Sequence, residues 1–142
     1  MITPAHVHEA AHAVIAVVLG IEITAVTLDG VRTRVRVGDV EAARRSAIVA
    51  LCGLAAEFRH LGLTGDAEAR AWREAGRSAD VSNMFRYLDA AGGGEVEPIR
   101  REAVRVVHER WPAIRRTARR LAKHGTLDAA RVAAICELCP PG

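Results

Sequence analysis

The chain has 142 residues and a formal net charge of +3; half of its residues are hydrophobic but only 4% are aromatic. This length suits one domain, residues 1–142, with a core built mainly from Ala, Val, Leu and Ile. No apolar run is long enough to span a membrane, and no basic segment precedes the apolar stretch 13–19, so we expect neither a membrane span nor a signal peptide. We therefore expect a cytoplasmic protein. The three cysteines do not make a disulfide framework.

The N-terminal half predicts two helices separated by a hairpin. Thr3 and Pro4 are typical of a helix start, and Gly20 would end that helix after Leu19. Residues 21–37 carry strand formers, an Asp-Gly turn signal and a period-two alternation, which together indicate a β-hairpin. Residues 40–60 then predict a helix that is apolar on most sides and therefore central and buried.

The C-terminal half predicts further helices. Residues 66–78 are polar, which fits a short helix or a mobile segment, and a helix follows from Ala79 to about Ala91. Three glycines, 92–94, end the helical pattern, and a long helix that Pro112 kinks or divides follows them. We expect a last helix from about Thr126. The fold class is therefore mainly α (α+β), with a small hairpin or sheet after the first helix.

The first predicted helix carries the motif His-Glu-Ala-Ala-His at residues 8–12. Because His8 and His12 are four residues apart, both imidazoles lie on one face of the helix, one turn apart, where they can bind one Zn²⁺. Glu9 lies beside them and can act as a general base toward a water that the metal polarises. The pattern predicts a zinc hydrolase.

A catalytic zinc site usually has three protein ligands. No histidine follows His12 at a spacing that would supply the third one from the same region. The candidates on later helices are Glu57, Asp66 and Asp80.

Several segments together resemble the M41 peptidases, the zinc protease domain of the FtsH-type membrane AAA+ proteases. Residues 8–14 are similar to the family's zinc-binding helix, with Ala11 where the family usually has Gly. Residues 51–57 are similar to a second family helix, with Leu54 where Arg is common. The likeness covers nearly the whole chain, because further similar segments occur in the family's order at residues 25–28, 78–81, 95–96 and 126–128.

The resemblance implies a helical zinc-peptidase domain with Zn²⁺ as cofactor. By position it implies that His8, His12 and Asp80 bind the metal and that Glu9 is the general base. Asp66 is the alternative third ligand, because residues 66–78 look like an insertion relative to the family. Glu57 is expected to orient a ligating histidine rather than to bind the metal.

The family's ATPase module and membrane anchor have no counterpart in this sequence, and the glycines at 92–94 lack the Lys-Ser/Thr of a phosphate-binding loop. We therefore expect a metalloprotease that cleaves peptides or already unfolded proteins and has no ATPase activity of its own. A separate ATPase or adaptor could supply substrate. The oligomeric state is left open.

Cys136 and Cys139 form a single CxxC pair near the C-terminus. A zinc knuckle would need a second such pair, so we expect two ordinary thiols.

The C-terminal part of the chain is basic. Its cations are Arg100, Arg101, Arg105, Arg110, Arg115, Arg116, Arg119, Arg120 and Lys123. This basic stretch predicts a solvated helix face balanced by Glu95, Glu97, Glu102 and Glu109, so a nucleic-acid partner is not favoured.

Two alternatives to a peptidase stay open. The first is a catalytically inactive M41-like binding or regulatory module, against which the presence of Glu9 argues. The second is a small basic helical protein that binds nucleic acid.

Overall fold

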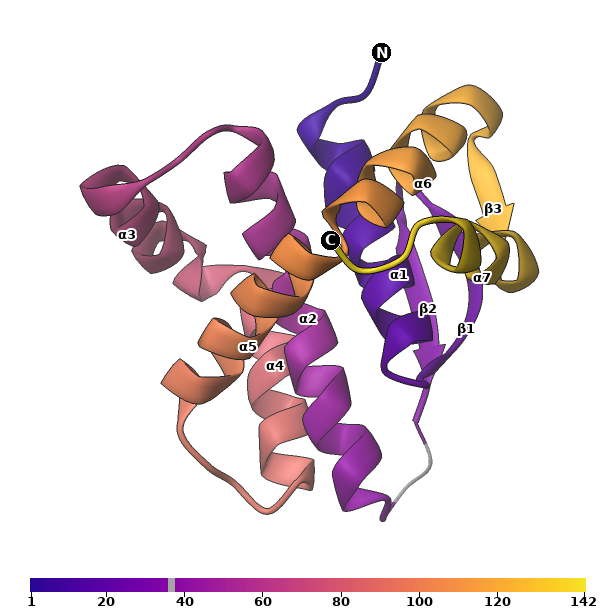
Figure 1. Cartoon of the computed structure of the whole chain (residues 1–142). Helices are drawn as coiled ribbons and strands as arrows, with labels where there is room; N and C mark the ends of the chain where they lie inside the picture. Colours follow the sequence, from indigo (N-terminus) through magenta and orange to yellow (C-terminus); the bar gives the residue numbers. More distant parts are fainter. Residues whose placement is uncertain (36–37) are drawn as a thin grey trace.

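The computed structural model describes residues 1–35 and 38–142, which form seven α-helices and a small antiparallel sheet that lies at one side of the molecule beside α1, α6 and α7 (Figure 1). The predicted mainly α (α+β) fold class is confirmed. In chain order the elements are α1 (Pro4–Val18), β1 (Glu22–Thr27), β2 (Gly30–Arg34), α2 (Val40–His60), α3 (Gly65–Glu74), the 3₁₀ turn η1 (Ala75–Arg77), α4 (Ala79–Ala90), α5 (Val96–Glu109), α6 (Trp111–His124), β3 (Thr126–Asp128) and α7 (Ala129–Leu138).

Helix α1 begins and ends as its sequence predicts. The Thr3 hydroxyl accepts a hydrogen bond from the His6 backbone N–H, Pro4 occupies the first turn, and Gly20 follows the helix with a φ of 76°. Such a φ favours glycine because it has no Cβ. From Ala10 to Ala16 every residue of α1 is buried. This run fixes His12 within the core, whereas His8, one turn earlier, is half-buried at its edge.

The sheet has the strand order β2-β1-β3. Strands β1 and β2 form the predicted hairpin, and β3 pairs with the other side of β1. The prediction that a helix begins near Thr126 is wrong, because residues 126–128 form β3 and Asp128 caps α7 by accepting from the Arg131 N–H. Within residues 21–37, which are expected to form this hairpin, the second strand ends at Arg34, and residues 36–37 lie outside the described residues.

Helix α2 is the centre of the molecule, as predicted. Every residue from Ser46 to Ala56 is buried, and the helix packs against α1, α4 and α5. Many of the buried residues of α2 are alanine or glycine, and such small side chains let neighbouring helices approach closely. This close approach brings α1 and α4 together over one face of α2.

The remaining helices follow the predicted breaks. Residues 65–77 form α3 and η1, neither of which contains a buried residue. Pro112 divides the long basic helix, since α5 ends at Glu109 and Pro112 lies in the first turn of α6. None of the helices in the described ranges combines the length and apolar composition that crossing a membrane requires.

Candidate metal centre

Two histidines one turn apart on α1 form the first part of the site. The rings of His8 and His12 have their centroids 4.9 Å apart and meet edge to face. Their side chains are 17% and 11% exposed. The spacing of four residues therefore gives the predicted pair of imidazoles on one helix face.

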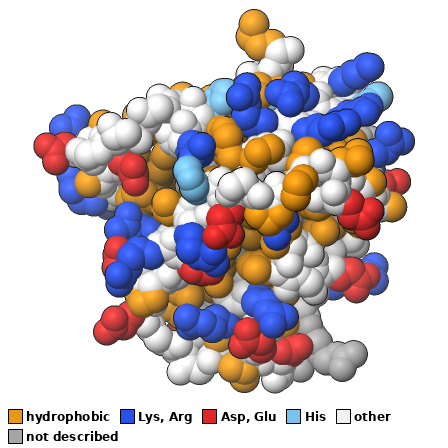
Figure 2. All heavy atoms as spheres, viewed as in Figure 1, with side chains coloured by type: hydrophobic (Ala, Val, Ile, Leu, Met, Phe, Trp, Pro, Cys, Tyr) orange, Lys and Arg blue, Asp and Glu red, His pale blue; other side chains and the backbone are white. Residues whose placement is uncertain are grey.

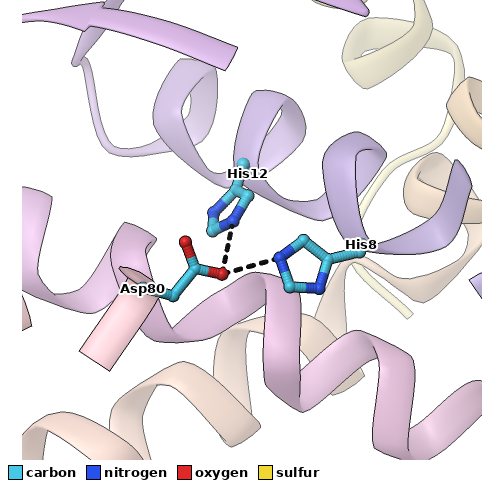
Figure 3. A group of neighbouring side chains, drawn as sticks. All are labelled: His8, His12 and Asp80. Carbon is cyan, nitrogen blue, oxygen red and sulfur yellow. Dashed lines mark hydrogen bonds and ion pairs between the residues drawn. The ribbon is translucent and has the colours of Figure 1, made fainter. Parts of the chain in front are cut away.

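Asp80 approaches this pair from the first turn of α4. Its Oδ2 lies 2.6 Å from Nε2 of His8 and 3.1 Å from Nε2 of His12 (Figure 3). Ser78 fixes the start of α4, because its hydroxyl accepts from the Val81 N–H. Residues separated by about seventy positions in the sequence thus meet at one carboxylate oxygen.

The other ring nitrogen of each histidine has its own partner on α2. Nδ1 of His12 lies 2.9 Å from the carbonyl oxygen of Val49, to which it can only donate. Nδ1 of His8 lies 3.3 Å from Oε2 of Glu57, in agreement with the predicted orienting role of Glu57. When Nδ1 donates, a neutral imidazole has its lone pair at Nε2. Both lone pairs then point at the space next to Asp80.

Gly53 of α2 leaves room for the two rings. A Cβ atom at this position would lie 2.5 Å from Nε2 of His12 and 2.6 Å from Nε2 of His8. Real Cβ atoms essentially never approach other atoms so closely, so any side chain here would displace both imidazoles. The glycine costs α2 about 1 kcal/mol of helix propensity relative to alanine. Its place in a buried helix is explained by the space that the histidines occupy.

Glu9 lies between the histidines in sequence and lines the same cavity as His12 and Asp80. Its Oε2 is buried and has no hydrogen-bond partner within the described residues. Burial raises the pKa of its carboxyl group, while the charges of His12 and His8 lower it to a smaller extent. A buried carboxylate oxygen without a partner is rare, because desolvation without a hydrogen bond is costly.

The charges of the cluster shift the pKa values of its other members. Burial would raise the pKa of Asp80, but hydrogen bonds and charges from His12 and His8 outweigh burial and hold it well below its usual range. Burial would lower the pKa of His8, but the hydrogen bond and charge of Asp80 outweigh burial and raise it. In the protein without metal, Asp80 is therefore the anion that holds the two rings together.

The residues of the cluster fit a zinc ion. Two imidazole nitrogens and one carboxylate oxygen are a donor set that catalytic zinc sites use. One ligand atom from each of His8, His12 and Asp80 lies within 4.8 Å of the other two. The buried Oε2 of Glu9 without a partner and the space kept open by Gly53 fit the same interpretation.

A cavity of about 390 Å³ opens beside the cluster. Strand β2, which forms an edge of the sheet, supplies one wall through Gly30, Val31 and Thr33. Helix α4 supplies another wall through Asn83 and Tyr87. An edge strand beside a cleft can bind an extended peptide by main-chain hydrogen bonds.

The alternative third ligand is not part of the cluster. Asp66 is exposed in the first turn of α3, and the group of three in the described residues contains Asp80. His6, the other histidine of α1, is not part of this group; it caps the helix, because its Nδ1 accepts from the Thr3 N–H at 3.0 Å. Cys136 and Cys139 are unpaired thiols at the end of α7.

Sequence reasoning missed the two groups of α2 that shape the site. The Val49 carbonyl is a backbone atom and leaves no signal in a sequence. Gly53 does leave one, because an isolated glycine within an apolar helix is unfavourable and needs a packing reason.

Neither a comparison with protein-family models nor one with curated protein sequences gives a match for this chain. The resemblance to the M41 peptidases therefore stays a prediction.

Proposed function

We propose that this protein is a zinc-dependent endopeptidase in which His8, His12 and Asp80 hold the metal and Glu9 is the general base. One observation carries the proposal: Oδ2 of Asp80 lies 2.6 Å and 3.1 Å from the Nε2 atoms of the two histidines, although Asp80 lies far from them in the sequence. A structural salt bridge needs one histidine and one acid. It does not need two rings with both Nε2 atoms directed at the same oxygen.

Each residue of the cluster has a distinct task in this proposal. The bound zinc would act as a Lewis acid and stabilise negative charge that develops on water and on a carbonyl oxygen. Glu9 accepts the proton of the attacking water at its free carboxylate oxygen and returns it to the leaving amine. Glu57 and the Val49 carbonyl keep the histidine rings oriented through their Nδ1 atoms.

The substrate of this proposal is an extended peptide or an unfolded protein. Strand β2 has its second neighbour position free in the described sheet and lines the cavity with Gly30, Val31 and Thr33. A peptide that pairs with this edge would run past Glu9 and the metal ligands. A folded protein would need a separate ATPase or adaptor to reach this state. The three unpaired thiols fit a reducing compartment such as the cytoplasm.

The test compares the wild-type protein with Glu9→Gln after both have been loaded with zinc. We expect both proteins to contain the same amount of zinc by inductively coupled plasma mass spectrometry. Only the wild type should cleave fluorescein-labelled casein. Gln keeps the size of the side chain and cannot take the proton. Cleavage by Glu9→Gln at the wild-type rate would contradict the role of Glu9. Wild-type protein that holds zinc and cleaves neither casein nor short peptides would favour the inactive binding module.

A further inference from the structure

The exposed side of α6 carries five cations, Arg115, Arg116, Arg119, Arg120 and Lys123, which we call the α6 basic face. Four of them are exposed and Arg120 is half-buried. No Asp or Glu occurs between Arg110 and Gly125. Figure 2 shows Lys and Arg side chains gathered at the upper right of the molecule, where Figure 1 places α6.

None of these five cations forms an ion pair with a carboxylate in the described residues. The neighbouring helix α5 differs in this respect. Its arginines pair with glutamates of the same helix, Arg100 and Arg101 with Glu97, and Arg105 with Glu102 and Glu109. Three of the four glutamates expected to balance the whole basic stretch are thus used within α5.

The core holds the α6 basic face in a fixed orientation. The opposite side of α6 buries Ile114, Ala118 and Leu121, so the helix cannot rotate to separate its cations. Arg115, Arg119 and Lys123 follow one another at intervals of four residues, and so do Arg116 and Arg120. Like charges at this spacing destabilise a helix. The face therefore keeps an electrostatic repulsion that an anionic ligand would relieve.

The dimensions of the face fit a polyanion rather than a single small anion. Eight residues separate Arg115 from Lys123, which is about 12 Å along the helix axis. Between the cations lies a shallow hollow lined by Arg116, Arg119, Arg120 and Lys123, without an acidic side chain. Nucleic acid presents phosphates at regular short intervals along a line, which such a row of cations can follow.

We propose that the α6 basic face binds the phosphate backbone of nucleic acid without reading the base sequence. Arginine is suited to this task, because its guanidinium group can donate two hydrogen bonds to one phosphate. Protein partners usually need an apolar or aromatic centre in the interface, and the apolar side chains of α6 from Ala113 to Leu121 are buried in the core. The same burial leaves α6 without an apolar face to insert into a bilayer.

The test measures binding of the full chain to a fluorescein-labelled DNA duplex of mixed sequence by fluorescence anisotropy. Between about 50 and 200 mM NaCl we expect the affinity to fall roughly 10²–10³-fold, since five phosphate contacts give a log–log slope of about −4.5. The variant Arg116→Gln/Arg120→Gln should reduce the steepness of that slope by about two. A second duplex of unrelated sequence should bind equally well.

The control is Arg70→Gln/Arg73→Gln, which removes the same charge from exposed positions on α3, across the molecule from α6. It should keep the wild-type slope, and both variants should keep the wild-type circular dichroism spectrum. Equal losses in the two variants, or no DNA binding at low salt, would overturn the proposal. Binding to phosphatidylserine vesicles but not to DNA would also overturn it and would assign the face to a membrane surface, with the exposed Met1 that borders the face as an anchor. The outcome does not depend on peptidase activity.

Discussion

The candidate metal centre and the α6 basic face are both groups of ionisable side chains, but the first is enclosed by three helices and the second lies open to solvent. In the candidate metal centre individual atoms have defined neighbours, such as the Val49 carbonyl for Nδ1 of His12 and Oδ2 of Asp80 for both Nε2 atoms. On α6 the total positive charge of five cations matters, and no single side chain has a defined ion-pair partner in the described residues. Single atoms therefore decide the chemistry of the buried group, whereas salt and total charge decide that of the exposed one.

The largest effect is expected from removal of the carboxylate that joins α4 to α1. Asp80→Ala should weaken zinc binding by more than about 100-fold, because even residues that only orient a ligand contribute about 10–100-fold. Competition with a fluorescent zinc chelator would measure the affinity. The matched control Asp66→Ala removes an exposed carboxylate of α3 and should bind zinc like the wild type. If the two variants lost zinc equally, Asp80 would not be a ligand.

A smaller change should result from filling the space beside the rings. Gly53→Ala places a Cβ where it would overlap Nε2 of both histidines, so we expect about 10–100-fold weaker zinc binding. Gly76→Ala is the control, because an added Cβ there has no atom within 4 Å. Unchanged zinc affinity in a folded Gly53→Ala protein would mean that the histidines do not depend on this space.

A still smaller effect is expected for the residue that orients His8. Glu57→Ala removes the acceptor 3.3 Å from Nδ1 of His8 and should weaken zinc binding by about 10-fold. Because its side chain is 31% exposed, the fold should tolerate the change. The same chelator competition would measure it. A loss as large as that of Asp80→Ala would indicate that Glu57 is itself a ligand.

The smallest expected effect is on the free energy of unfolding, which should change in opposite directions when an arginine is removed from α6 or from α5. Arg116→Gln relieves repulsion with Arg119 and Arg120 and should raise the free energy of unfolding by up to about 0.5 kcal/mol. Arg105→Gln removes the pairs with Glu102 and Glu109 and should lower it. Urea denaturation at low salt measures both, and high salt should reduce the difference. Equal signs for the two variants would contradict the contrast between the helices.

The sequence predicted the parts of the fold that local patterns determine. The capped start of α1, the buried α2 and the division at Pro112 all follow from periodicity and helix-terminal residues. Strand β3 escaped prediction because it has three residues and exists through its pairing with the distant strand β1. A short strand of this kind carries too few residues for a periodic signal.

The candidate site was predictable to a different extent for each residue. The motif at 8–12 gives His8, Glu9 and His12 by spacing alone. The third ligand is different, because the residues alone offer several carboxylates and only the resemblance favours Asp80 over Asp66. The unequal charge balance of α5 and α6 was predictable in principle, since the glutamates of α5 lie three or four residues from its arginines. Counted over one long helix, these glutamates balance the cations of both parts, although they pair only with arginines of α5.

X-ray absorption at the zinc edge of the loaded protein identifies the atoms bound to the metal and so shows whether His8, His12 and Asp80 hold it. We predict nitrogen and oxygen neighbours only, at about 2.0–2.2 Å, with the multiple-scattering features of two imidazoles. These features should weaken in His12→Ala, which leaves His8 as the only imidazole of the cluster. Sulfur neighbours at about 2.3 Å would contradict the account, because they would place the zinc at Cys136 and Cys139 instead of at His8, His12 and Asp80.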